Sequence, residues 1–475
     1  MLDFVIAPLL LAAFTALTIA VLRACWAADV RRHGDDKLVT LTFYVAIGHV
    51  FIFMGLPAIF RFALNWSTDR AFQVSPSEIV HVYFIELVSF AAWCIAFTAV
   101  RALLSQPRAL VPSTETRRSH TASIFLFLML ALGAIRSAEM LFSRAELAAG
   151  GGVIGATSLV SDRFFWPLLP ATTLAGSVVG CYVLARGRKY FGTPLWASAV
   201  AGLGLYLAAF GLAGVRGTLV WPVLWSALIV RLYRPALWKP VAVIAVLGTL
   251  GLGTFQSTYL ALRSTASEGT VSERIATLQD APRESANLAE AIESRIGATS
   301  RYSVGFVRMW ERGRRAYWAP IANSAWAPVP RLFYPDKPWP TSADGDQYSS
   351  GMYLCVGEIH RRENYTMTEF LTGSHAYWEF GWAGVIGLSA VAGAFIASCI
   401  RFTGRMSGAA APALLLFFKP WGYNNPKLWV SDIVLELVQI VPALLALWFA
   451  ARAFGHLFGT SRRKRSLDLP SVGAQ

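Results

Sequence analysis

The sequence predicts an all-α, polytopic membrane protein with about eleven transmembrane helices and one large segment outside the membrane. The first observation is composition: 55% of the 475 residues are hydrophobic and only 15% are charged, with a mean hydropathy of +0.49. The second is a series of apolar runs, most of them near the roughly 20 residues that span a bilayer core. The third is that basic residues cluster between these runs, as they do on the cytoplasmic side of membrane proteins.

Eleven apolar runs are candidate membrane helices, and those at 218–233 and 409–423 are the shortest. The runs cover residues 4–24, 38–60, 79–104, 121–142, 164–185, 194–213, 218–233, 241–262, 376–400, 409–423 and 431–452.

The distribution of Lys and Arg predicts the orientation of these helices. Alternate connections on one side hold 21 basic residues, whereas the short connections on the other side hold eight. The positive-inside rule then places the N-terminus outside and the C-terminus inside. Four regions follow: helices one to eight in 1–262, a large outer loop in 263–375, helices nine to eleven in 376–455, and a basic inner tail in 456–475.

Several classes of function are not favoured. The net charge of +14 lies in short clusters between apolar runs rather than on one basic surface, so nucleic-acid binding is not expected. The histidines are scattered, and neither Cys-x-x-Cys nor His-Glu-x-x-His occurs, so we expect no metal or cofactor. Of the five cysteines, only Cys355 falls in a long polar segment, which predicts no disulfide framework. The N-terminus lacks the features of a cleaved signal peptide, and a retained first helix is expected.

A rigid proline-rich ledge at 328–340 is the most distinctive part of the outer loop. Five prolines in these thirteen residues fix φ repeatedly and disfavour helix in the preceding residues. The ledge carries Arg331 and Lys337, together with Tyr334 and Trp339. Cations and aromatic rings of this kind suit diphosphate oxygens and the apolar faces of sugars.

Other polar residues gather on the predicted outer side. Arg216 lies in a glycine-flanked turn between two membrane runs, where a ligand could approach the backbone closely. A boundary arginine that only anchors the helix is the alternative. Within the loop, 270–299 predicts an amphipathic helix, and a basic and aromatic stretch at 308–318 follows it. The segment 358–379 supplies carboxylates and histidines before the ninth predicted span.

The Arg216 turn, Arg301-Tyr302-Ser303, the ledge, and Glu379-Phe380-Gly381-Trp382-Ala383-Gly384 occur in an order and spacing that resembles the O-antigen (Wzy-type) polymerase family. The resemblance covers roughly 130–400. It implies a bacterial inner-membrane, multi-pass enzyme with a GT-C-like helical bundle and a periplasmic loop. Such enzymes join undecaprenyl-diphosphate-linked oligosaccharide repeat units, which serve as both donor and acceptor, without a nucleotide sugar or an essential metal. Membrane lipids, a chain-length regulator and a flippase are the implied partners, and O-antigen, capsule or exopolysaccharide the implied product.

This resemblance assigns roles to particular residues. A diphosphate leaving group gathers negative charge, which the arginines Arg216, Arg301 and Arg331 would stabilise. A general base would take the proton of the acceptor hydroxyl, and the candidates are Glu358, His360, Glu369, His375 and Glu379. The expected substrate-binding residues are Lys337, Arg136, Tyr334, Trp339 and Arg308. Interfacial aromatic belts would explain the rings equally well, and Arg136 could instead pair with Glu139.

Three alternatives stay open at this stage. An O-antigen ligase would present a similar arginine-lined site and differ in its acceptor. A flippase or secondary transporter would be expected to show internal repeats and interrupted helices, whereas this chain concentrates its polar residues in one outer loop. A structural assembly subunit would fit the apolar bulk but would leave the Arg216 turn and the ledge unexplained.

Overall fold

The computed structural model describes part of the chain, and every element in that part is helical. The described residues are 2–34, 36–63, 73–104, 120–142, 179–212, 230, 235–240, 243, 297–326, 329, 333–334, 371–404, 433–434, 437–438, 442 and 445–455. Four helical spans among them are long and apolar enough to cross a membrane: Ile6–His33, Thr42–Ala63, Pro76–Leu103 and Thr372–Arg401. The described part of the chain is therefore that of a helical membrane protein. The larger number of eleven spans and their orientation stay predictions.

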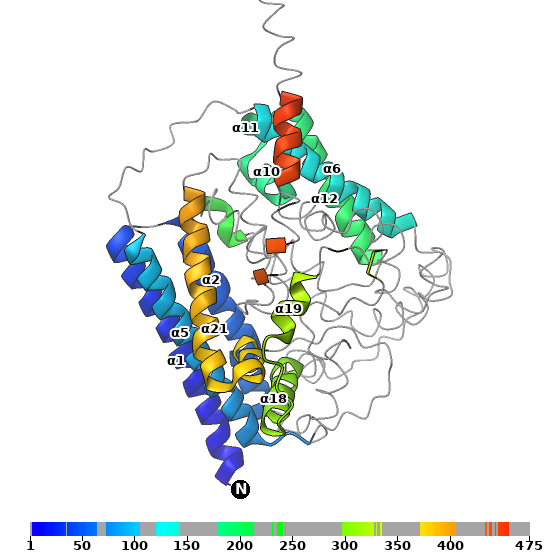
Figure 1. The fold of residues 1–475 in the computed structure, drawn as a ribbon. Coiled ribbons are helices and arrows are strands. Elements are labelled where there is room, and N and C mark those ends of the chain that lie inside the picture. The colour runs from blue at the N-terminus through cyan, green and yellow to red at the C-terminus, as the bar shows by residue number, and fades with distance from the viewer. Residues whose placement is uncertain are drawn as a thin grey trace, which may run out of the picture.

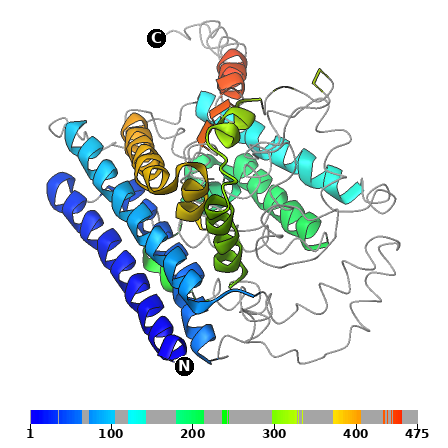
Figure 2. The same ribbon diagram turned by 60° about the horizontal axis from the view of Figure 1, so that its bottom comes forward.

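The N-terminal helices form one bundle with a later helix of the chain (Figure 1). This bundle contains α1 (Leu2–His33), α2 (Lys37–Val50), α3 (Leu56–Ala63), α5 (Pro76–Leu103) and α21 (Thr372–Gly404). Helix α5 lies between α1 and α21 and packs against both (Figure 2). These helices occupy the predicted runs 4–24, 38–60, 79–104 and 376–400, although α21 begins four residues earlier than the predicted run.

The second span contains a π-helical turn, Phe51–Gly55, between α2 and α3. Pro57 lies two residues after this turn, and proline has no N–H to donate to the carbonyl of residue 53 and clashes with it in a regular α-helix. Widening the preceding turn accommodates this defect without ending the span.

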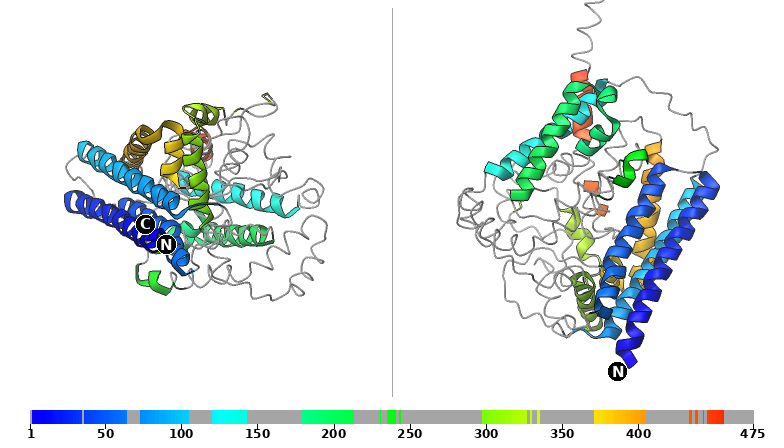
Figure 3. Two further views of the ribbon diagram at one scale, coloured as in Figure 1. Left: turned by 90° about the horizontal axis from the view of Figure 1, so that it is seen from below. Right: turned by 180° about the vertical axis from the view of Figure 1, so that it is seen from behind.

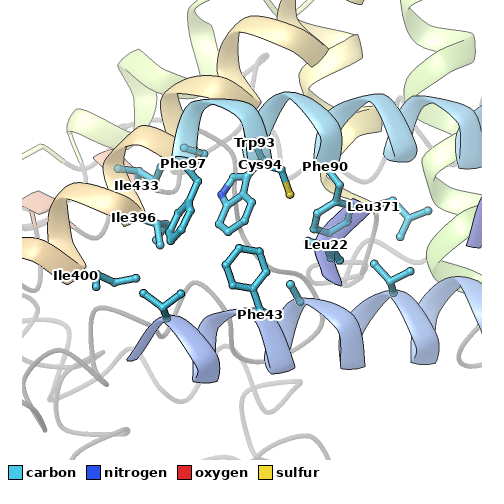
Figure 4. Packing of buried hydrophobic residues seen from close by; sticks show 14 of the residues in the cluster. Leu22, Phe43, Phe90, Trp93, Cys94, Phe97, Leu371, Ile396, Ile400 and Ile433 are labelled. Atoms are coloured by element: carbon cyan, nitrogen blue, oxygen red, sulfur yellow. The ribbon is translucent and has the colours of Figure 1, made fainter. Parts of the chain in front are cut away.

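Aromatic and small residues pack the centre of the bundle. Phe43 of α2 meets Trp93 and Phe97 of α5 edge-on, with ring centroids 5.6 and 5.3 Å away, and the two α5 rings stack at 5.0 Å (Figure 4). Helix α21 approaches α5 through small residues. The Ser89 and Ser389 hydroxyls lie 2.7 Å apart, in the manner of close helix packing in membranes.

A second set of helices lies beside this bundle. It contains α6 (His120–Phe142), α10 (Gly180–Arg186), α11 (Arg188–Phe191) and α12 (Thr193–Leu212). Helices α6 and α12 run side by side (Figure 3) and coincide closely with the predicted runs 121–142 and 194–213. A 3-10 turn at Pro235–Leu237 is also described.

Two short helices, α18 (Ala298–Glu311) and α19 (Ala319–Ala325), lie in the segment predicted as the outer loop. Helix α18 packs against α5 and α21 at the end of the bundle where α1 begins (Figure 1). The buried Arg61 of α3 donates to the Ser300 hydroxyl at 2.7 Å and to the Gly297 carbonyl at 3.2 Å. Arg308 near the other end of α18 donates to Glu78 of α5 at 2.6 Å. These two arginine contacts fix α18 to the bundle.

The opposite end of the bundle is closed by an ion-pair network. Arg101 of α5 donates to the buried Asp29 of α1 at 3.1 and 3.2 Å, and it lies 3.5 Å from Asp36. His33 lies 3.1 Å from the same Asp29 carboxylate. Since Asp29 and Arg101 belong to different helices, this network ties α1 to α5.

The α5–α21 contact predicts that a methyl group added at one glycine of α21 destabilises the protein, whereas one added at another glycine does not. A Cβ at Gly393 would overlap the Trp93 carbonyl oxygen, whereas a Cβ at Gly387 of the same helix would meet nothing within 4 Å. We expect Gly393→Ala to destabilise the protein by about 1–3 kcal/mol through overpacking. Gly387→Ala should be neutral or stabilising by up to about 1 kcal/mol, because alanine favours helix. Thermal unfolding of the solubilised variants measures both, and equal melting temperatures would contradict this packing.

Candidate functional site

Helix α21 is broken near its start. Phe380 (φ −140°, ψ 17°) and Gly381 (φ 62°, ψ −145°) leave the helical region and separate a half-helix, 372–379, from the long part, 382–404. Only glycine adopts the Gly381 conformation readily. A Cβ at Gly381 would also lie 2.6 Å from Cζ2 of Trp310 on α18, and one at Gly384 would overlap the Ala376 carbonyl oxygen. The half-helix therefore lies tightly against both α18 and the long part of its own helix.

The N-terminus of the half-helix is held by side chains from two other helices. Gly373 donates its backbone N–H to Oε2 of Glu86 on α5 at 2.8 Å. Leu371 donates its N–H to the Ser303 hydroxyl on α18 at 2.7 Å. Both acceptors are buried. They satisfy amide groups that have no partner within a helix at its first turn.

The C-terminus of the half-helix is held by the turn that follows α18, residues 312–318. Ala316 donates its N–H to the Trp378 carbonyl at 3.3 Å, and Tyr317 donates to the Glu379 carbonyl at 3.2 Å. In return, the Trp378 indole N–H donates to the Arg314 carbonyl at 2.8 Å. The turn thus satisfies carbonyls that the helix break leaves without intrahelical partners.

Between these two ends the half-helix carries a fully buried His–Glu pair. Nδ1 of His375 lies 3.0 Å from Oε1 of Glu379, one helical turn away, and both side chains are 0% exposed. The rings of Phe306 and Trp378 flank the imidazole, each with its centroid 5.3 Å away. Within the described part of the chain, neither Glu379 oxygen has a hydrogen bond of good geometry. Incompletely satisfied buried carboxylates are unusual and are found disproportionately at functional sites.

The turn 312–318 presents cations and aromatic rings to the surface. Arg312, Arg314 and Arg315 are all exposed. The Trp318 ring is 64% exposed and rests edge-on against Phe380 of the helix break, with centroids 4.9 Å apart. Arg315 also lies over the Trp310 ring at 4.5 Å. An exposed surface that combines guanidinium groups and an indole can bind anionic groups and sugar faces.

The structure places some of the other predicted residues and leaves several undescribed. Arg301 lies on α18 and is buried, 3% exposed. Arg308 pairs with Glu78, so its guanidinium already holds α18 to α5. Tyr334 is exposed and contacts Trp326 edge-on at 5.8 Å. Arg136 lies in α6, with its side chain outside the described part.

The remaining predicted site residues fall outside the described part of the chain. They are Arg216, Arg331, Lys337, Trp339 and Glu358, with the alternative bases His360 and Glu369. Their roles stay predictions. Among the residues that the structure does describe, His375 and Glu379 come together.

Sequence reasoning did not anticipate α18, the helix break or the part played by Glu86. The predicted amphipathic helix at 270–299 lies almost entirely outside the described residues, and the helix that the structure describes runs from 298 to 311. A signal was present, since Ser300, Val304 and Val307 follow helical spacing. Gly381, within a motif that carried the family resemblance, was the only local sign of the break.

The part of the fold that the structure describes defines a helical membrane protein with an interrupted helix at one end of its bundle. Comparisons of the chain with protein-family models, curated proteins and solved structures found no match.

The helix break predicts a difference between two glycines with positive φ. Gly381→Ala combines the backbone strain with a collision against Trp310, whereas Gly313 (φ 76°) has nothing within 4 Å of a Cβ. We expect Gly313→Ala to destabilise by about 1–2 kcal/mol from conformation alone, and Gly381→Ala by about 1–3 kcal/mol more from overpacking. Thermal unfolding in detergent checks this, and equal losses for both variants would contradict the close contact at Gly381.

Proposed function

We propose that the protein is a bacterial inner-membrane glycosyltransferase that polymerises undecaprenyl-diphosphate-linked oligosaccharide repeat units at the periplasmic face. One observation carries the proposal beyond the sequence resemblance: the exposed cationic and aromatic turn 312–318 is hydrogen-bonded directly to the half-helix that carries His375 and Glu379. Groups suited to a charged glycolipid thus adjoin a buried acid–base pair. Helix α18, which packs on α21, lies at the end of the bundle where α1 begins (Figure 1), and the charge distribution predicts this end to be periplasmic.

The proposed reaction needs two catalytic contributions: stabilisation of the leaving group and removal of a proton from the acceptor. The glycosyl bond to the diphosphate breaks, and the developing negative charge on the leaving group is stabilised by arginines. Arg301, Arg216 and Arg331 keep that proposed role, and Arg314 and Arg315 of the turn are added as groups that draw the diphosphate toward the site. The bond to the acceptor sugar forms as its hydroxyl loses a proton to Glu379, with His375 as the partner that orients the carboxylate.

Burial of the pair sets a condition on this mechanism. Both side chains are fully buried, so a substrate hydroxyl reaches Glu379 only if part of the surrounding structure moves aside. Closure over bound substrate would exclude water, which favours transfer to a sugar over hydrolysis. Trp318 is in position to contact the acceptor glycan, because its ring lies on Phe380 at the break.

Deletion of the gene in its own host gives a first test. We expect single repeat units to accumulate on the carrier lipid in the deletion strain, seen when surface polysaccharide and lipid-linked intermediates are separated by size. Polymer of normal length stranded on the carrier lipid would instead indicate a ligase. Single units trapped on the cytoplasmic side would indicate a flippase. Either outcome contradicts polymerisation.

Complementation of that strain then tests the pair. Glu379→Gln should abolish long chains, because removing a general base slows a reaction by about 10²–10⁴-fold, while the protein stays in the membrane. Glu311→Gln is the matched control, since Glu311 is an exposed carboxylate at the end of α18. Long chains in the Glu379→Gln strain would remove Glu379 from the mechanism.

A further inference from the structure

We infer that Glu86 of α5 is the positioning residue of the candidate site: it holds the half-helix 372–379, and with it the His375–Glu379 pair, in place. The inference concerns how the pair is held, and its catalytic meaning rests on the proposed function. In the sequence, Glu86 is an ionisable residue inside the predicted membrane run 79–104. Its contacts in the fold indicate that it holds the start of the half-helix.

The first observation is the burial of Glu86 and the nature of its contact. The side chain is 0% exposed, and its Oε2 accepts the Gly373 N–H at 2.8 Å. Its Oε1 has no hydrogen-bond partner among the described residues. A carboxylate inside a membrane bundle is unfavourable unless specific contacts offset its desolvation. Here that contact comes from the positively polarised N-terminus of a helix, whose amide dipoles favour a carboxylate.

The second observation is the shape of the contact. A Cβ at Gly373 would lie 2.8 Å from Oε2 of Glu86, 2.9 Å from Cβ of Ser89 and 3.1 Å from Cγ2 of Ile85. The missing side chain lets the start of the half-helix press against α5. Glu86 therefore fixes both the distance of the half-helix from α5 and its rotation.

The third observation is that the half-helix and the long part of α21 are held separately. The long part, 382–404, packs on α5 through the Ser89–Ser389 contact and the close approach of Gly393 to Trp93. These contacts do not involve Glu86. Loss of the Glu86 contact should therefore loosen the half-helix and leave the bundle assembled. Misplacing a reacting group by about 1 Å can slow a reaction by about 100-fold.

Two replacements of similar size separate the effect of the hydrogen-bond acceptor from the effects of side-chain charge and side-chain volume. Glu86→Gln keeps a carbonyl oxygen that can accept the Gly373 N–H, whereas Glu86→Leu fills the space without an acceptor. Hydrogen exchange of the full-length protein in lipid nanodiscs, read on peptides covering 371–379, measures the contact without any activity. Peptides covering 382–404 are the internal control. Turnover of a lipid-linked repeat unit at varied concentration separates kcat from KM.

For Glu86→Leu we expect exchange in 371–379 to be about 10- to 100-fold faster than in the wild type, because the buried Gly373 amide loses its hydrogen-bond acceptor. Exchange in 382–404 should be unchanged. The kcat should fall at least about tenfold with KM within about twofold, since the pair is misplaced while the exposed turn still binds substrate. Glu86→Gln should exchange like the wild type in both segments and keep kcat within about threefold.

Other results would overturn the inference or the proposed function separately. Unchanged exchange at 371–379 in Glu86→Leu, or equal losses in Glu86→Gln and Glu86→Leu, would show that Glu86 does not position the half-helix by capping it. Faster exchange spread over 382–404 as well would show a general structural role instead. If the exchange pattern is as expected but the wild type forms no polymer, the contact stands and the proposed function fails.

Discussion

The break in α21 is the constraint on which the rest of the candidate site depends. Interrupting a helix leaves amides and carbonyls without their intrahelical partners, and a membrane interior offers no water to satisfy them. In this protein the amides of the turn 312–318 supply partners at the break, and Glu86 on α5 and Ser303 on α18 accept amides at the start of the half-helix. A short segment that would otherwise be unstable is thereby fixed at both ends.

Helix α18 can serve this purpose because two arginines secure it. Arg61 binds the start of α18 from within the bundle, and Arg308 binds Glu78 at the start of α5. Glu78 also completes a capping box with Ser75, in which each residue accepts the other's N–H. One carboxylate thus fixes the start of α5 and the position of α18 together. The pair is half-buried, with the Arg308 and Glu78 side chains 17% and 33% exposed.

The spans could be predicted from the sequence because they depend on local composition, whereas the site depends on contacts between distant segments. The runs 4–24, 38–60 and 79–104 are helical in the structure, and so is 376–400 apart from the break at Phe380 and Gly381. Residues 376–384 are mostly apolar and suggest an uninterrupted helix start, and Gly381 alone does not distinguish a break from helix packing. What decides the break is Trp310, Ala316 and Tyr317, which come from another part of the chain. His375 and Glu379 were found as candidates by residue type, but their burial and 3.0 Å spacing follow only from the fold.

Reconstitution tests the proposed activity most directly. The purified full-length protein in lipid nanodiscs, given a synthetic undecaprenyl-diphosphate-linked repeat unit and no nucleotide sugar, should form a ladder of longer lipid-linked chains. It should release one undecaprenyl diphosphate for each bond formed, and Glu379→Gln should do neither. Absence of both ladder and released carrier in the wild type, with the protein folded and the substrate bound, would contradict the polymerase assignment.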